Sequence, residues 1–257
     1  MKVSVPVVKC PPKIVLFLLG ISICACNTLK RVGPEEQLLT NYRVVADSQE
    51  VRDPEVRDLV LQRPNNRLLG IPLQLHLYNL AKKDADSAYQ AWLHRKPQRP
   101  ERLRALLSQK QVERLGESFL VSGLSRWLKK VGQAPALVDS SRTEKSLQRL
   151  GAWYYNRGYF NQERRFVVDS LSDRRAEVRY LLKLGEPYGI DSLRWDIAST
   201  DLDSIYRQNR QGSLVKPGTR YDLKDFTAER ERLTQLFRNS GIWNFQESSI
   251  TFDVLRD

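Results

Sequence analysis

Two stretches of the chain place apolar residues at helical spacing and then end at a glycine. The first contains Leu150 and Tyr154 and ends at Gly158, and the second covers residues 222–239 and ends at Gly241, 83 positions further on. Apolar residues at i and i+4 share one helix face, and a glycine after the last turn readily adopts the positive φ that ends a helix. The pattern therefore predicts two amphipathic helices, each closed by a glycine.

The residues around the two glycines match one another, which indicates an internal repeat. The matched pairs are Arg149 with Arg232, Leu150 with Leu233, Asn156 with Asn239, Phe160 with Trp243, and Asn161 with Asn244. An aromatic residue follows each glycine, and we expect it to fold back onto the apolar face of the preceding helix. The predicted structural turns consist of Gly158, Tyr159 and Phe160 in the first copy, and Gly241 and Trp243 in the second.

Strand-like segments flank the first of these helices. They are residues 42–45, 166–171 and 178–182, and a further helix begins where Asp53 supplies an N-cap and Pro54 occupies the first helical position. The repeat therefore runs strand, helix, helix, strand, strand. This order predicts an α+β domain with a three-stranded sheet and two helices on one face.

The second repeat follows the same order but stops one strand short. Its first strand is expected at residues 190–197, its helices at 201–211 and 222–239 with Asp222 as N-cap, and its second strand at 247–255. Because the last strand of the repeat is missing, we expect this chain to be part of a longer gene product.

A long insertion, residues 63–134, separates the two helices of the first repeat. Within it Leu124, Trp127 and Leu128 recur at helical spacing. Two interpretations stay open. The apolar stripe packs on the core of its own domain, or Trp127 and Leu128 belong to a contact surface for a membrane leaflet or a partner helix.

The reactive residue types do not form a catalytic or metal-binding pattern. His76 and His94 lie 18 positions apart with no acidic or cysteine partner at ligand spacing. The sequence also lacks a Gly-x-Ser-x-Gly motif, a phosphate-binding loop and a dinucleotide fingerprint. We therefore expect no enzyme activity, no metal, no cofactor and no small-molecule substrate.

The first 25 residues are organised like a secretion signal. Three lysines and no acidic residue accompany the apolar run 14–21, which is too short to span a membrane well. Ile23, Ala25 and Cys26 then fit a bacterial lipobox, in which a branched residue and a small residue precede the cysteine. Cleavage there would make Cys26 the lipid-bearing first residue and would remove the other two cysteines, so no disulfide is expected.

Charge and composition refine this picture. The formal net charge of +12 favours an anionic partner. Because an exported lipoprotein does not meet the chromosome, we expect anionic lipid or an acidic protein and not nucleic acid. The predicted organisation is a signal peptide at 1–25, a lipid anchor and flexible tether at 26–38, a first domain at 39–187 with its insertion, and an incomplete second domain at 188–257.

The strand and helix order and the glycine-aromatic turn resemble POTRA domains. Residues 63–80, which include Leu69-Gly70-Ile71-Pro72, and residues 127–135 further look like the lipidated TamA-like proteins of Bacteroidetes, the TamL family of the BamA/TamA superfamily. The resemblance covers roughly residues 20–257. It implies tandem POTRA-like domains, each with its third strand between the other two, lipid-anchored on the periplasmic side of the outer membrane.

The resemblance also implies a function in inserting or assembling outer-membrane proteins. The expected partners are a TamB-like periplasmic protein and outer-membrane protein clients. POTRA domains bind by adding a strand to a sheet edge. The edge expected here contains Arg165, Phe166, Val167 and Val168, since arginines at the start of a strand discourage aggregation. The family's β-barrel is not part of this sequence, so insertase activity is not expected of it alone.

One alternative function follows from the same features. The chain would be a stand-alone periplasmic lipoprotein that binds unfolded clients or a partner protein.

Overall fold

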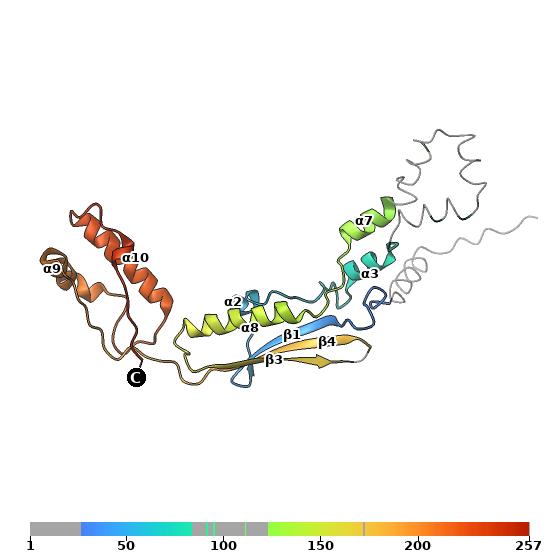
Figure 1. Cartoon of the computed structure of the whole chain (residues 1–257), viewed down its shortest axis with the longest axis horizontal. Coiled ribbons are helices and arrows are strands. Elements are labelled where there is room, and N and C mark those ends of the chain that lie inside the picture. The colour runs from blue at the N-terminus through green and yellow to red at the C-terminus, as the bar shows by residue number, and fades with distance from the viewer. Residues whose placement is uncertain are drawn as a thin grey trace, which may run out of the picture. The chain divides into compact units, whose positions relative to one another are not determined.

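The computed structural model describes residues 27–83, 91, 95, 111, 123–171 and 173–256, and its fold is mixed α+β (Figure 1). Among these residues, six α-helices accompany a four-stranded sheet. The predicted signal peptide, Cys26 and most of residues 84–122 of the insertion lie outside the described residues. Of the described helices, none is long and apolar enough to cross a membrane.

The sheet has its last strand between the two other long strands. Its members are β1 (Leu38–Ala46), β2 (Gln49–Glu50), β3 (Glu163–Ser170) and β4 (Arg175–Lys183), in the order β2-β1-β4-β3. The Leu38 N–H donates to the Arg174 carbonyl (2.8 Å) and the Asp47 N–H to the Leu182 carbonyl (3.0 Å). Because both residue numbers rise together, β1 and β4 run parallel.

Short hairpins join the remaining strands. β1 and β2 pair antiparallel with Val45 opposite Glu50, and the Leu171 N–H donates to the Arg175 carbonyl (2.7 Å) where β3 turns into β4. The predicted strands at 42–45, 166–171 and 178–182 therefore correspond to β1, β3 and β4, and each observed strand is longer than its prediction.

Two helices accompany this sheet, and α8 lies along it (Figure 1). In α2 (Pro54–Asp58), Asp53 caps the first turn by accepting the Glu55 N–H (2.9 Å), as predicted. The longer helix α8 (Ser140–Tyr155) presents small and apolar residues to the core. The buried residues of α8 are Thr143, Ser146, Leu147, Leu150, Gly151 and Tyr154.

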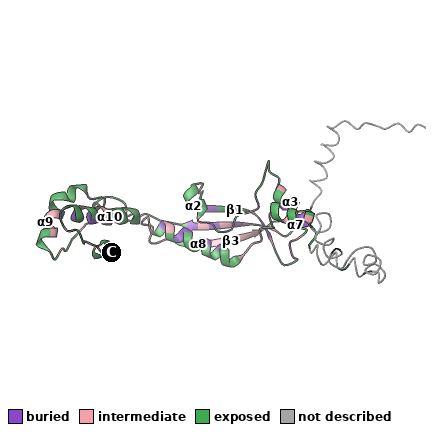
Figure 2. Ribbon diagram, turned by 90° about the horizontal axis from the view of Figure 1, so that it is seen from above, coloured by how far each residue is buried: buried purple, intermediate pink, exposed green. Residues whose placement is uncertain are grey.

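The central strand supplies the other half of this core. Burial alternates along β4, so that Ala176, Val178, Tyr180 and Leu182 are buried on one face. Figure 2 shows buried residues, in purple, on α8 and on the sheet beside it. A half-buried strand with period-two burial is what the sequence alternation predicts. The free energy of unfolding of this part of the protein therefore depends mainly on apolar area enclosed between α8 and the sheet.

The chain divides into two compact units. The first contains Met1–Tyr42, Arg63–Asp139 and Asp169–Glu177, and the second contains Arg43–Gln62, Ser140–Val168 and Val178–Asp257. The first unit holds α3 (Leu73–Leu80) and α7 (Leu124–Val131).

The segment that starts the described chain is packed, which corrects the predicted flexible tether. Leu29 and Val32 are buried with Leu38 and Leu75 in one apolar cluster. Two apolar residues three positions apart in an otherwise polar segment give too weak a signal to indicate burial. Their side chains nevertheless fill the space beside α3, so residues 27–38 belong to the first unit.

A strained two-residue turn precedes α3. Leu68 pairs with Ile71, and between them Leu69 (φ +52°) and Gly70 (φ +81°) both adopt positive φ. This is the geometry of a type I′ hairpin turn, which favours asparagine or glycine at both positions. A leucine in the left-handed region loses about 1–2 kcal/mol relative to the right-handed form. The Leu69 side chain is 95% exposed, so burial does not offset this strain.

We expect Leu69→Asn to raise the free energy of unfolding by about 0.5–1 kcal/mol, because asparagine tolerates this backbone conformation. Urea denaturation followed by circular dichroism measures the change. Leu68→Asn is the matched control, since Leu68 is also exposed but does not have positive φ. Equal effects of the two substitutions would contradict the prediction.

The second repeat forms its predicted helices but not its predicted strands. Helix α9 (Thr200–Asn209) continues into a short 3-10 turn, Arg210–Gly212, and α10 (Leu223–Asn239) begins after Asp222, which accepts the Lys224 N–H as the predicted N-cap. Tyr206, Leu233 and Phe237 form the buried core between them.

The strands predicted at 190–197 and 247–255 are absent. Residues 190–197 form no strand, and residues 247–255 contain only a 3-10 turn, Glu247–Ser249. In the first repeat, β1 and β3 both pair with the strand between them, β4. No described residue of the second repeat supplies that central strand, so the segments 190–197 and 247–255 have no neighbouring strand with which to form hydrogen bonds.

Candidate docking site

Three backbone segments meet at the glycine that follows α8. The Gly158 carbonyl accepts the Tyr188 N–H (2.9 Å), and the Tyr188 carbonyl accepts the Tyr221 N–H (2.9 Å). Gly158 has φ +89°, and a Cβ at this position would lie 3.1 Å from the carbonyl oxygens of both tyrosines. Glycine therefore meets two requirements at once, namely a left-handed backbone and close approach of two neighbouring segments.

Aromatic side chains cover this meeting point. The Phe160 ring contacts the rings of Tyr155 (4.8 Å between centroids), Tyr188 (5.3 Å) and Tyr221 (5.1 Å). Tyr159 packs edge-on against Tyr154 of α8 at 5.7 Å. The first copy of the predicted turn thus folds back onto its helix. It also packs against Tyr188 and Tyr221, which follow β4 in the chain.

Charged groups at the end of α8 also stabilise this joint, which is the contact of Gly158 with Tyr188 and Tyr221. The guanidinium of Arg157 stacks over the Trp153 ring, 3.5 Å from its centroid, and pairs with Glu55 at 3.3 Å. Lys224 at the start of α10 approaches the same carboxylate at 3.8 Å. Glu55 is exposed, so each ion pair contributes little, and the aromatic packing provides most of the stabilisation.

The second copy of the turn is open, which corrects the expectation for Trp243. Gly241 has φ +100°, but a Cβ there would meet no atom within 4 Å. Trp243 is 83% exposed and does not fold back onto α10. Phe245 takes the place on that helix instead, with its ring 4.8 Å from that of Phe237. The turn that is covered in the first repeat is therefore accessible in the second.

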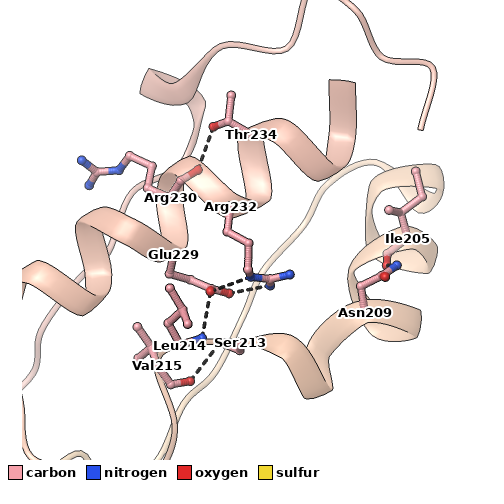
Figure 3. A network of polar contacts seen from close by, with 9 residues as sticks. All are labelled: Ile205, Asn209, Ser213, Leu214, Val215, Glu229, Arg230, Arg232 and Thr234. Atoms are coloured by element: carbon pink, nitrogen blue, oxygen red, sulfur yellow. Dashed lines mark hydrogen bonds and ion pairs between the residues drawn. The ribbon is translucent and has the colours of Figure 1, made fainter. Parts of the chain in front are cut away.

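A buried carboxylate fixes α10 to the segment after α9 (Figure 3). Glu229 is 2% exposed and accepts hydrogen bonds from Nε and Nη2 of Arg232, both at 2.8 Å, and from the Leu214 N–H at 2.9 Å. Burial alone would raise the pKa of Glu229, but these hydrogen bonds outweigh it and hold the pKa below its ordinary value. Glu229 is therefore ionised in the folded protein at neutral pH.

The first repeat has a neutral counterpart of this contact. Ser146, 83 positions before Glu229, is buried in α8, and its Oγ accepts the Leu61 N–H at 3.0 Å. In both repeats a buried polar residue of the second helix thus accepts a backbone N–H from the segment that follows the first helix. Glu229 lies between Phe226 and Leu233 at helical spacing, which is a signal for burial, but the surrounding charges of α10 are typical of a solvated face.

The predicted partner-binding residues lie on an edge strand of the described sheet. β3 pairs only with β4 in the strand order, and it contains Arg165, Phe166, Val167 and Val168. Arg165 is exposed, and the other three are partly buried. Backbone N–H groups point alternately to the two sides of a strand. The Leu171 N–H points towards β4, so the Val168 N–H, three residues earlier, points to the side of β3 away from β4.

The predicted surface residues of the insertion lie on α7. Trp127 is 50% exposed and Leu128 is partly buried, so the stripe does not pack fully into a core. In the part of the chain that the structure describes, no group of three or more His, Cys, Asp or Glu side chains could hold a metal ion.

Comparison with known proteins adds one structural neighbour. No family model matches the chain, and no curated protein matches it. The crystal structure of Haemophilus Influenzae BamA POTRA3-5 matches 82% of this chain and 89% of its own, with 11% sequence identity and a TM-score of 0.26. A TM-score this low carries no argument, so the topology rests on the strand order described above.

Proposed function

We propose that this chain is a periplasmic docking region that takes part in outer-membrane protein assembly and is lipid-anchored through Cys26. The observation that carries the proposal is the mixed sheet, in which β4 lies between a parallel neighbour, β1, and an edge strand, β3. Among the described strands β3 has one neighbour, β4, so its other side can meet a partner's strand. The sequence resemblance to the TamL family supports the finer assignment, with a TamB-like protein and outer-membrane clients as partners.

The chemistry of β3 suits binding by strand addition. Outward N–H and C=O groups of an edge strand give affinity without requiring a particular partner sequence. Arg164 and Arg165 at its start are exposed, and such charges limit pairing between copies of the chain. Strands of outer-membrane barrels alternate apolar and polar residues, so they can present one face to the docking sheet and the other to solvent.

Hydrogen exchange of backbone amides tests this proposal. The probe is a synthetic peptide of about ten residues with alternating apolar and polar side chains. We expect it to protect the outward amides of Phe166 and Val168 from hydrogen exchange. Val168→Pro should abolish the effect because proline lacks the donor, while Val168→Thr retains the N–H and should keep it.

Two outcomes would count against the proposal. Protection at the Trp243 turn and not at β3 would move docking away from the sheet edge. Unchanged binding to the Val168→Pro variant, with its circular dichroism intact, would exclude strand addition at this edge.

A further inference from the structure

Helix α7 carries an apolar stripe that faces away from its packing partner. Leu124, Trp127 and Val131 are 42%, 50% and 42% exposed. They occupy positions i, i+3 and i+7 and therefore share one helix face. Ser125, by contrast, is buried, and its Oγ accepts the Lys82 N–H at 3.3 Å just after α3 ends.

Close backbone packing fixes the direction of this stripe. Gly132 ends α7, and a Cβ there would lie 2.6 Å from the Tyr78 nitrogen of α3. The next residue donates its N–H to the Gln74 carbonyl at 3.0 Å. Because backbone meets backbone at this point, α7 cannot rotate to bury Trp127 against α3 without losing these contacts.

The residues that directly follow the predicted lipid attachment site contact α3. Asn79, near the end of α3, donates from Nδ2 to the carbonyls of Asn27 and Thr28, both at 3.2 Å. Lys30 Nζ donates to the Asn79 carbonyl at 2.9 Å. The Cα of Cys26 is one peptide unit, about 3.8 Å, from that of Asn27. A lipid on Cys26 would therefore be attached one residue before a segment that contacts α3.

The charge of the helix pair fits an anionic surface. Neither α3 nor α7 contains an acidic residue, and α7 contains Arg126, Lys129 and Lys130. Lys82 and Lys83 follow α3 after one intervening residue, Ala81. Basic residues beside an exposed apolar stripe are the composition that binds anionic lipid head groups.

We propose that the α7 stripe of Leu124, Trp127 and Val131 lies in the head-group layer of the membrane to which the chain is anchored. This inference rests on the lipid anchor of the proposed function. The acyl chain and the stripe would form two attachment points in the first unit, so α3 and α7 would lie against the bilayer. One lipid leaves a protein free to swivel, whereas two attachments fix an orientation.

An environment-sensitive fluorophore tests the contact. Because Cys26 is acylated in the proposed mature chain, Leu124→Cys gives a single free thiol, which is labelled with nitrobenzoxadiazole. The labelled lipoprotein is placed in phosphatidylcholine vesicles with about one-third phosphatidylglycerol. We expect a blue shift and quenching by brominated lipid. Trp243→Cys, at the exposed turn of the second unit, is the matched control and should show neither.

A second measurement separates this inference from the anchor. Mass spectrometry reports whether Cys26 carries acyl chains. The Cys26→Ser chain is then tested for binding to the same vesicles, where Trp127→Glu should weaken binding about tenfold and Trp243→Glu should not.

Each adverse outcome has a distinct meaning. An acylated chain whose Leu124 probe behaves like the Trp243 control overturns the α7 contact and leaves the anchor in place. A blue-shifted Leu124 probe without vesicles means that protein covers the stripe, which also overturns it. If Cys26 carries no lipid, the anchor fails, and equal vesicle binding of the two glutamate variants would then refute the α7 surface.

Discussion

Replacing Arg232 with alanine is expected to lower the free energy of unfolding by about 3–5 kcal/mol at neutral pH. The substitution removes the charged partner of the buried Glu229 carboxylate and leaves it the neutral donors Leu214 N–H and the Ser213 side chain. An unpaired buried charge is far more costly than a missing surface pair. Urea denaturation followed by circular dichroism measures the loss.

The same substitution should reverse the pH dependence of the contribution that Glu229 makes to the free energy of unfolding. In the wild type the pKa of Glu229 is lowered on folding, so its stabilisation is complete above the ordinary value of 4.5 and is lost as the pH falls through the lowered pKa. Without Arg232, burial should dominate and raise the folded pKa. The variant would then gain stability as the pH falls from that raised pKa towards 4.5.

A neighbouring ion pair provides the control. Arg207 and Asp203 of α9 approach to 2.8 Å, but 64% of the Arg207 side chain is exposed. Arg207→Ala should therefore change the free energy of unfolding by less than about 1 kcal/mol. If the two alanine variants lose similar stability, or if both keep the wild-type pH profile, Glu229 is not the buried, ionised anchor described above.

Gly158→Ala should destabilise the protein by about 2–4 kcal/mol. About 1–2 kcal/mol arises from the left-handed backbone, and the rest from displacing the Tyr188 and Tyr221 carbonyls that a Cβ would approach. Hydrogen exchange should become faster at the Tyr188 and Tyr221 amides, whose hydrogen bonds close the joint. Urea denaturation gives the overall change.

Gly241→Ala separates the two causes. Gly241 also has positive φ, but a Cβ there meets open space, so only the backbone contribution of about 1–2 kcal/mol is expected. The difference between the two variants measures the close approach at Gly158. Identical losses would mean that the neighbouring carbonyls yield freely and that the joint is looser than its geometry indicates.

Local signals in the sequence predicted the helices well. Asp53 with Pro54, and Asp222, are caps whose effect depends only on the next few residues, and both act as caps in the structure. The strands of the first repeat were also found, because period-two alternation marks a half-buried strand.

Features that depend on distant partners were not predictable. The strands expected at 190–197 and 247–255 require a central strand, and pattern alone cannot show whether one is available. The burial of Leu29 and Val32 depends on α3, which lies more than 40 positions away in the sequence. The Glu229 contact was missed because a glutamate among the charges of α10 resembles a solvated residue, although its side chain is enclosed.

The hydrogen bond from the Leu61 N–H to Ser146 also bears on how this protein could be re-engineered. The contact closes the connection after α2 just before Arg63, where the chain leaves the second unit for the first. Lengthening a flexible loop is inexpensive, about 0.6 kcal/mol for each doubling. A different segment spliced in after Arg63 would leave this hydrogen bond, and with it the register of α2 and α8, in place.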